Sequence, residues 1–525
     1  KSVLGLLSEM PAYGNLLERI DKQRETSEVA VINAAKPYLI AALYRDLRMP
    51  IIVITSKADN ANKLKEQIVA WCGSDSNIDL FPEPDRLPYQ RVSTDNFSEN
   101  ERIRVLSGLF KYDKNRATPL VIMSTQSLMQ KVTALEDFKA SYHIIKLGMQ
   151  IEPYELLKKW QSLGYKSESI VELPGSMSHR GGILDIYPLT SEKPVRLEFM
   201  GNTIDSLRLF DPQTQRSQES ISSIEIALAT ELIAPLLMKK SELKGIIDAI
   251  DLSGCSADVK RHYKQDLNIF LEGGIPAEKQ FYAPLFNTGN VLDYISDNSL
   301  IILDEQQNIN QTMEHLDAEA GQLKQDKLTN RELPNGYPSS YFSIEDIQLR
   351  LNKRKKLSLS SWGDVSRLDF SPAKDFGGKL PDFADEVRGL LSSKNRVIVV
   401  THQAKRLSEL LEEEDIYSVN LDEKQDATPG FGAISITGGA VTDGWIMNGN
   451  TCLFTDSEVF GFIKQRRFAK KRPVAKVKLY EDIKPGDYVV HIEHGIARFT
   501  GITRMGASSI EYMVLQYAEG DRLYV

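Results

Sequence analysis

The chain has 525 residues, of which 42% are hydrophobic and 26% charged, and its formal net charge is −8. This composition is typical of a soluble globular protein of about three to four domains, and the acidic balance excludes a global basic footprint for nucleic acid. No apolar run reaches the roughly 18 residues that span a bilayer, and no signal peptide opens the chain. The three cysteines, Cys72, Cys255 and Cys452, are widely spaced, which fits a reducing compartment and no zinc pattern. We therefore expect a cytoplasmic protein without membrane contact.

The first region, residues 1–133, carries the pattern of a parallel sheet with covering helices. Apolar residues at 29–31, helical spacing over 38–48 and a second apolar run at 51–54 predict a strand, a helix and a strand. In nucleoside triphosphatases the first turn reads GxxxxGK followed by Ser or Thr, and it holds phosphates. Here the turn is NAAKPY, with no glycine and with Pro37 after Lys36. The sequence predicts a nucleotide-binding shape that has lost its nucleotide site.

Residues 134–222 form a second block of a different kind. YELLKKWQSLGY predicts an amphipathic helix, and SHRGGILDIYPL and VRLEFMGNTIDSLRLFD alternate like antiparallel strands with glycine turns. Helices return in 223–365, where the apolar strand SLIILDE ends in Asp304 and Glu305. These acids stand where a Walker B pair would bind Mg²⁺, but without a phosphate loop we expect no active site there. Residues 353–375 are interpreted as a connector.

The rest of the chain comprises a third α/β region at 366–461, a basic linker at 462–478 and a tail at 479–525. The linker includes KQRRFAKKR, which either contacts DNA or is a solvated segment, and we favour the second. In the tail, Pro485 and Gly486 predict a turn before closely spaced strands, which favours a small β-barrel. His491, Glu493 and His494 do not share one strand face, so we expect no metal site. The strand pattern stops at Val525, which suggests a piece of a longer protein.

These motifs carry a family resemblance. KPGDYVVHIEHGIARF with GDRLYV resembles the RNA-polymerase-interacting module shared by CarD regulators and the bacterial transcription-repair coupling factors, the Mfd family. The segments LPYQ, ERIRVLSGLF, SHRGGILDIYPL and VRLEFMGNTIDSLRLFD resemble, in order, the part that this family shares with the excision-repair protein UvrB. The resemblance implies a multidomain α/β fold: a degenerate UvrB/helicase-like scaffold with an inserted α+β domain, a further α/β domain and a Tudor/SH3-like C-terminal barrel.

The resemblance also implies a function, that of an adaptor which binds the β subunit of stalled RNA polymerase and recruits UvrA for nucleotide excision repair. The family's UvrA contacts fall on Arg180, Arg196, Phe199 and Met200, although the family tends to have an aromatic residue where Met200 stands. Its polymerase contacts fall on Ile502, Thr503, Arg504 and Met505. We expect no catalytic, cofactor-binding or metal-binding residues in these 525 residues. ATP, Mg²⁺ and most DNA contact belong to a translocase motor beyond them.

Two other functions stay open at this point. A UvrB-like DNA-dependent ATPase would need the phosphate loop that NAAKPY lacks. A CarD-like transcription regulator would not need the large region that resembles the repair scaffold.

Overall fold

The structure is a computed structural model, and it describes residues 3–22, 27–91, 97–112, 117–363, 366–422, 428–461, 485–491, 495–505, 510–517 and 522–524. The chain divides into two compact units, Lys1–Arg466 and Arg467–Val525. The predicted basic linker, 462–478, lies outside the described residues, as do Glu493 and His494.

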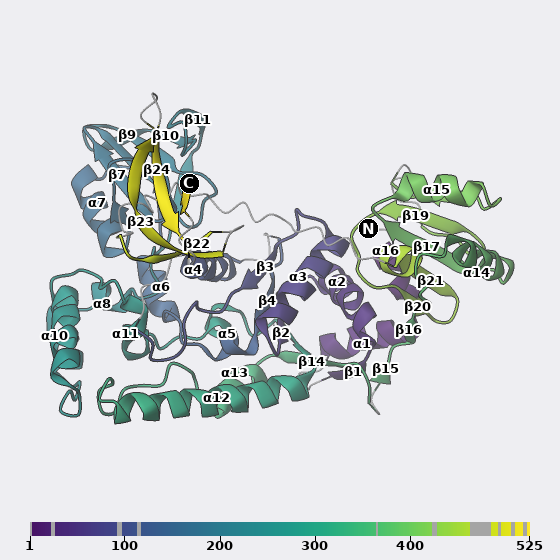
Figure 1. Ribbon diagram of the computed structural model, residues 1–525, viewed down its shortest axis with the longest axis horizontal. Helices are drawn as coiled ribbons and strands as arrows, with labels where there is room; N and C mark the ends of the chain where they lie inside the picture. Colours follow the sequence, from purple (N-terminus) through teal and green to yellow (C-terminus); the bar gives the residue numbers. More distant parts are fainter. Residues whose placement is uncertain are drawn as a thin grey trace. The chain divides into compact units, whose positions relative to one another are not determined.

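The first unit is built on a seven-stranded sheet in which every neighbouring pair is parallel (Figure 1). The strand order is β15-β1-β14-β13-β2-β4-β3. The strands are β1 (Ser27–Ala30), β2 (Ile51–Thr55), β3 (Ile78–Phe81), β4 (Leu120–Ser124), β13 (Leu300–Asp304), β14 (Lys355–Ser360) and β15 (Ser366–Arg367). The predicted parallel sheet is confirmed.

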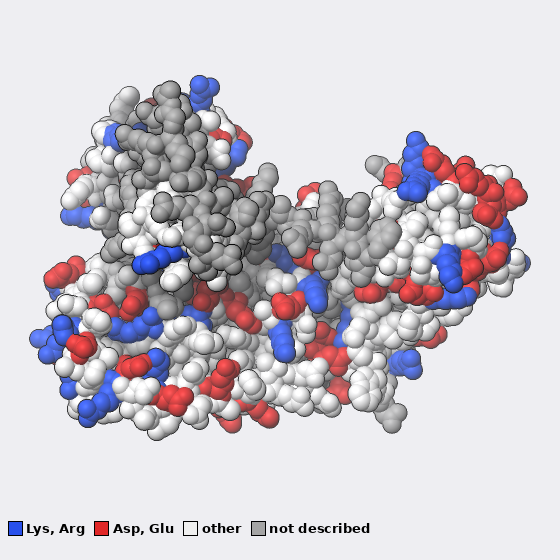
Figure 2. All heavy atoms as spheres, viewed as in Figure 1, with Lys and Arg blue, Asp and Glu red and all other residues white. Residues whose placement is uncertain are grey.

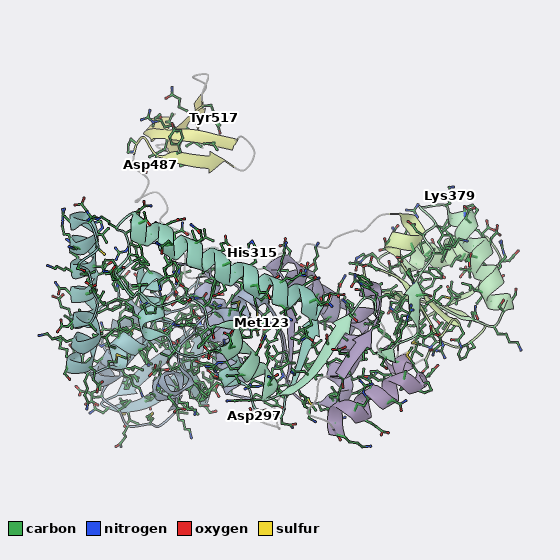
Figure 3. All side chains as sticks on the ribbon, turned by 90° about the horizontal axis from the view of Figure 1, so that it is seen from below. Met123, Asp297, His315, Lys379, Asp487 and Tyr517 are labelled. Atoms are coloured by element: carbon green, nitrogen blue, oxygen red, sulfur yellow. The ribbon has the colours of Figure 1, made fainter. Side chains whose placement is uncertain are left out.

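Helices cover both faces of this sheet, which explains why β2, β4 and β13 are apolar without alternation. The two faces pack against different sets of helical elements, which we call the first and the second group. The first group is η1 (Val3–Glu9), α1 (Pro11–Lys22), α2 (Lys36–Leu47), after η2 (Asn33–Ala35), and α3 (Ala58–Cys72). The second is α4 (Phe97–Phe110), α5 (Thr125–Met129), α12 (Gln306–Thr329) and α13 (Ile344–Asn352). Figure 3 shows α12 by its labelled His315, and Met313 of this helix shares a core with Met123 of β4.

The interpretation of residues 353–375 as a connector is wrong. Lys355–Ser360 is β14, which lies between β1 and β13 near the middle of the parallel sheet. Its two apolar side chains, Leu357 and Leu359, are fully buried. The lysines at its start obscured the strand, because a basic run before a short apolar alternation reads as a solvated segment.

The block after residue 134 forms a six-stranded sheet of order β11-β10-β9-β8-β7-β6, antiparallel except for the β6–β7 pair. Its strands are β6 (Lys166–Ser167), β7 (Ser176–Arg180), β8 (Ile183–Ile186), β9 (Val195–Met200), β10 (Thr203–Phe210) and β11 (Ser217–Ser220). A separate ribbon pairs β5 (His143–Lys146) with β12 (Ser223–Ile226), next to α6 (Leu135–Ser141) and α7 (Pro153–Ser162). The helix and antiparallel strands predicted for this block are present.

A helical region and a third sheet complete the first unit. The helical region contains α8 (Ala234–Leu237), α9 (Lys240–Asp248), α10 (Ala257–Leu271), α11 (Lys279–Phe286) and η3 (Val291–Tyr294). The third sheet has the order β16-β20-β21-β17-β19-β18 and mixes parallel and antiparallel pairs. Its elements are β16 (Phe370–Pro372), α14 (Leu380–Ser392), β17 (Arg396–Thr401), α15 (Ala404–Glu412), β18 (Ser418–Asn420), β19 (Ile434–Gly438), β20 (Trp445–Met447), β21 (Thr451–Thr455) and α16 (Asp456–Phe460). Trp445 packs on Tyr38 of α2, with ring centroids 4.7 Å apart, so this sheet shares a core with the first.

The second unit contains a four-stranded antiparallel sheet of order β22-β23-β24-β25. The strands are β22 (Tyr488–His491), β23 (Gly495–Met505), β24 (Ile510–Gln516) and β25 (Arg522–Tyr524). Ala497, Phe499 and Leu515 form its small core. The described strands make an open sheet, so closure into a barrel stays a prediction.

Candidate protein interaction site

Arg180 and Arg196 both bind one buried carboxylate, that of Asp185 on β8. Asp185 pairs in register with Arg196 of β9, and its side chain is 1% exposed. Arg196 holds it with two bonds, Nε to Oδ1 at 2.8 Å and Nη2 to Oδ2 at 2.9 Å, and Arg180 adds Nη2 to Oδ2 at 2.8 Å. A bidentate guanidinium–carboxylate pair of this kind fixes both groups geometrically.

The two arginines differ in how much of each faces solvent. The Arg196 side chain is 14% exposed, and its guanidinium lies 4.7 Å from the ring centre of Phe210. Its hydrogen bonds to Asp185 raise the pKa of Arg196 above its ordinary value. The Arg180 side chain is 51% exposed. Much of the Arg180 side chain therefore faces solvent, whereas Arg196 is largely buried and holds Asp185, which Arg180 also contacts.

The two arginines lie on β7 and β9, which are not adjacent, because β8 runs between them. The residue that connects them, Asp185, was missed. Its signal in the sequence was a lone acid inside the apolar run GGILDIYPL, since a carboxylate in a buried strand position needs a cationic partner.

Phe199 and Met200 lie on opposite faces of the sheet, because successive side chains of a strand alternate. Met200 is on the face of Arg196 and is 73% exposed. Phe199 is on the other face, where it packs in part against the main core. Three of the four predicted UvrA-contact residues thus share one face, Arg180, Arg196 and Met200, and Phe199 does not.

The sheet edge that would bind a nucleotide is occupied by an internal ion-pair network. Lys36 is 4% exposed, and its Nζ donates to Asp304 Oδ1 at 2.6 Å and to Glu305 Oε1 at 2.7 Å. Glu305 has φ 59°, a left-handed conformation, and also accepts bonds from the backbone N–H, at 2.9 Å, and the hydroxyl of Ser361. Burial acts to raise the pKa of Glu305, but the bonds from Lys36 and Ser361 outweigh it and hold that pKa below its usual range. The lysine and the acids that a nucleotide and Mg²⁺ would need are thus bonded to each other.

The predicted polymerase-contact residues, Ile502, Thr503, Arg504 and Met505, form the second half of β23. Their backbones pair with β24, from Ile502 opposite Met513 to Met505 opposite Ile510. On the other edge of β23, β22 pairs only with residues 495–498. Within the described part of this sheet, no strand covers that edge along residues 501–505, and an uncovered edge can accept a strand from a partner.

No group of His, Cys, Asp and Glu in the described part of the chain could hold a metal ion. The helices of that same part include none with the length and apolar character of a membrane span.

Comparison with known proteins adds two domain matches. Residues 144–232 match the UvrB interaction domain family, and this range contains the whole arginine–aspartate cluster. Residues 483–525 match the CarD-like/TRCF RID domain family, and this range contains β22 to β25. The two matches define a chain that carries a UvrB interaction domain and a CarD-like/TRCF RID domain.

The relatives of the whole chain are transcription-repair-coupling factors. The chain is 28% identical to the one of Bacillus subtilis (strain 168) over 94% of its own length and 43% of that protein. It is 26% identical to that of Staphylococcus aureus (strain bovine RF122 / ET3-1) over 97% of its own length and 45% of that protein. Over nearly its whole length the chain is thus similar to the N-terminal region of transcription-repair coupling factors, the Mfd family, and the family resemblance is confirmed. It spans less than half the length of these relatives.

Proposed function

We propose that the chain is a two-ended adaptor of transcription-coupled repair. Residues 144–232 capture UvrA, and residues 483–525 hold the β subunit of RNA polymerase. The observation that carries the proposal is the presence of both domain types in one chain that is similar, over nearly its whole length, to transcription-repair-coupling factors. A degenerate UvrB-like scaffold carries the first domain, and an ATP- and Mg²⁺-dependent translocase motor that moves on DNA lies outside these residues.

The UvrA contact uses the exposed face of the six-stranded sheet. Arg180, half exposed beside the buried Asp185, pairs with an acidic group of UvrA, and Met200 adds apolar contact. Arg196 acts as a positioning residue because it holds Asp185. Phe199 supports the hairpin from the core side.

The polymerase contact uses β23. A strand of the β subunit pairs with the uncovered edge along residues 501–505, and Met505 anchors its end. Backbone pairing supplies affinity here, and side chains at alternate positions supply specificity.

We further propose that the Lys36 network binds no nucleotide, so this part of the protein does no catalysis. A nucleotide would have to break two charge-assisted bonds of a buried lysine, and the turn before α2 has no glycine that would let phosphate approach the backbone.

A single capture experiment tests the adaptor. The 525-residue chain, immobilised, should retain purified UvrA and RNA polymerase core at the same time, and neither should compete with the other. Loss of one partner when the other binds would contradict two independent ends. Mg²⁺-dependent nucleotide binding by the chain, measured by calorimetry, would favour the UvrB-like ATPase instead.

A further inference from the structure

A small pocket beside α4 contains a buried arginine that has no anionic partner among the described residues. Arg86 lies in the loop between β3 and α4 and is 8% exposed. Its Nε and Nη1 atoms are buried and make no hydrogen bond. Burial lowers the pKa of Arg86 to about 10, so the guanidinium keeps its charge at neutral pH. A buried charge without a counter-ion is one of the costliest features a protein core can hold.

The second cation of the pocket, Arg102, has hydrogen-bond partners for two of its three nitrogens. Arg102 of α4 is 1% exposed, and it donates to Glu231 Oε1 and to the carbonyl of Pro82, both at 2.8 Å. Its remaining nitrogen, Nη2, is buried without a hydrogen bond. Arg86 and Arg102 thus both bring unpartnered N–H groups to the pocket.

The charge of Glu231 acts on Arg86 through space, but among the described residues no acid that lines the pocket forms an ion pair with Arg86. Glu231 pairs with Arg102, and Glu99 accepts bonds from Thr230 and the backbone N–H of Glu231 and pairs with Lys279 at 2.6 Å. Asp85 is exposed and makes no ion pair with Arg86 within 4.0 Å in the described structure. The hydroxyl of Ser98 and the amide of Gln280 also line the space and can both donate. Ser98 stands in the first turn of α4, where the helix dipole favours negative charge.

The size of the pocket limits the occupant. Its volume is about 20 Å³, enough for about one water-sized particle. Phosphate and sulfate, with five heavy atoms, exceed it. A water molecule would satisfy the N–H groups but would leave the charge of Arg86 without an ion pair, beside the Arg102–Glu231 pair.

We propose that this pocket binds one small inorganic anion of the size of chloride, held between Arg86 and Arg102. The site joins three parts of the chain: the loop before α4, Glu231 at the end of the UvrB interaction domain, and Gln280 of α11. The bound anion stabilises this junction. The inference is independent of the proposed adaptor function.

Bromide, which scatters anomalously, tests the site directly. Crystals of the 525-residue chain grown in bromide should show an anomalous peak within about 3.5 Å of Arg86 and Arg102 nitrogens. Density there without anomalous signal would identify water and overturn the proposal.

Thermal unfolding gives a second measurement in solution. Replacement of gluconate by chloride at constant ionic strength should raise the unfolding temperature, because gluconate does not fit. At a chloride concentration about ten times the dissociation constant, binding to the folded state alone should raise the free energy of unfolding by about 1.4 kcal/mol.

Two variants test whether the chloride dependence of the unfolding temperature comes from Arg86. Arg86→Met should remove the chloride dependence, and it should fold in gluconate because an apolar side chain carries no buried charge. Arg104→Met is the matched control, an arginine of α4 that is 40% exposed, and it should keep the dependence. Equal chloride dependence in wild type and Arg86→Met would overturn the proposal.

Discussion

At the scale of residues, one carboxylate, that of Asp185, holds both arginines of the face that we propose for UvrA binding. Asp185 accepts three bonds from two arginines of different strands, and only Arg180 reaches solvent to a large extent. Loss of Arg196 and loss of Arg180 should therefore have different consequences.

Arg196→Ala should destabilise the domain. Removal of one partner from a buried ion pair costs about 3–5 kcal/mol, and we expect about 2–3 kcal/mol here because Arg180 still neutralises Asp185. Chemical denaturation checks this value. The double change Arg196→Ala with Asp185→Asn should recover part of the loss, and no recovery would contradict the proposed role of Asp185 as the buried charge.

Arg180→Ala should leave stability nearly unchanged, since the side chain is half exposed, and should weaken UvrA capture about tenfold or more, as expected for the loss of one charged interface contact. The measurement is a titration of UvrA against the immobilised chain. The exposed Arg261 of α10 provides a matched control, and Arg261→Ala should bind UvrA like wild type. Unchanged capture by Arg180→Ala would remove this residue from the site.

At the scale of elements, the β5–β12 ribbon contains a pH-sensitive contact. His143 Nδ1 lies 3.2 Å from the carbonyl of Ser141, and its Nε2 accepts a bond from Trp160 Nε1 at 3.4 Å. This arrangement needs a neutral ring, because a proton on Nε2 would face the indole N–H. Burial, with repulsion from Lys159, lowers the pKa of His143 to about 4.

The sign of the pH effect follows from linkage. The unfolded chain binds a proton at His143 below about pH 6.5, while the folded chain resists protonation down to about pH 4. The contribution of neutral His143 to the free energy of unfolding is therefore fully present above about pH 6.5 and is lost as the pH drops toward 4. His143→Gln keeps a donor and an acceptor but cannot titrate, so the loss of unfolding free energy between pH 7.5 and 5.0 should be smaller in this variant. An equal loss in both proteins would exclude His143 as the titrating group.

The second element-scale prediction concerns β23. Met505→Glu should abolish capture of the polymerase β subunit in a pull-down, because a charge at the anchor would be buried by the partner. Ile496→Glu provides a matched control on the same strand, where Ile496 is 68% exposed and its backbone pairs with β22. If both variants bind alike, the contact lies elsewhere on the module.

At the scale of the whole molecule, the first unit depends on strands that are far apart in the sequence. β1 pairs with β14 and β15, which lie more than 300 residues later in the chain. On the face shown in Figure 2, charges of both signs are scattered over the described residues, with acidic side chains gathered over α15, and these residues form no broad basic surface there. Because these strand partners all lie within Lys1–Arg466, we expect the first unit to fold without the second.

Truncation tests this division. Residues 1–461 should unfold like the full chain and keep UvrA capture but lose polymerase capture, since unit two is absent. Residues 1–350 should not fold cooperatively. This fragment lacks β14, and its loss would leave the backbone N–H and C=O groups of β1 and β13 without their partners. Circular dichroism and limited proteolysis distinguish these outcomes, and a stable 1–350 fragment would contradict the role of β14.

The sequence by itself determined the features that local pattern encodes. The apolar runs at 29–31 and 51–54 predicted the parallel strands, alternation predicted the hairpins after residue 176, and the missing glycines of NAAKPY predicted a turn unsuited to phosphate. Such features depend on neighbours within a few residues, which is why they can be read along the chain.

Only the tertiary structure decided which charges meet. It placed β14 near the middle of the sheet, joined Arg180 to Arg196 through Asp185, moved Phe199 to the opposite face from Met200, and brought Lys36 to two acids some 268 residues away. Coulombic and hydrogen-bonding partners are set by strand order and register. Both are properties of the assembled sheet, because they depend on contacts between segments that no local periodicity relates.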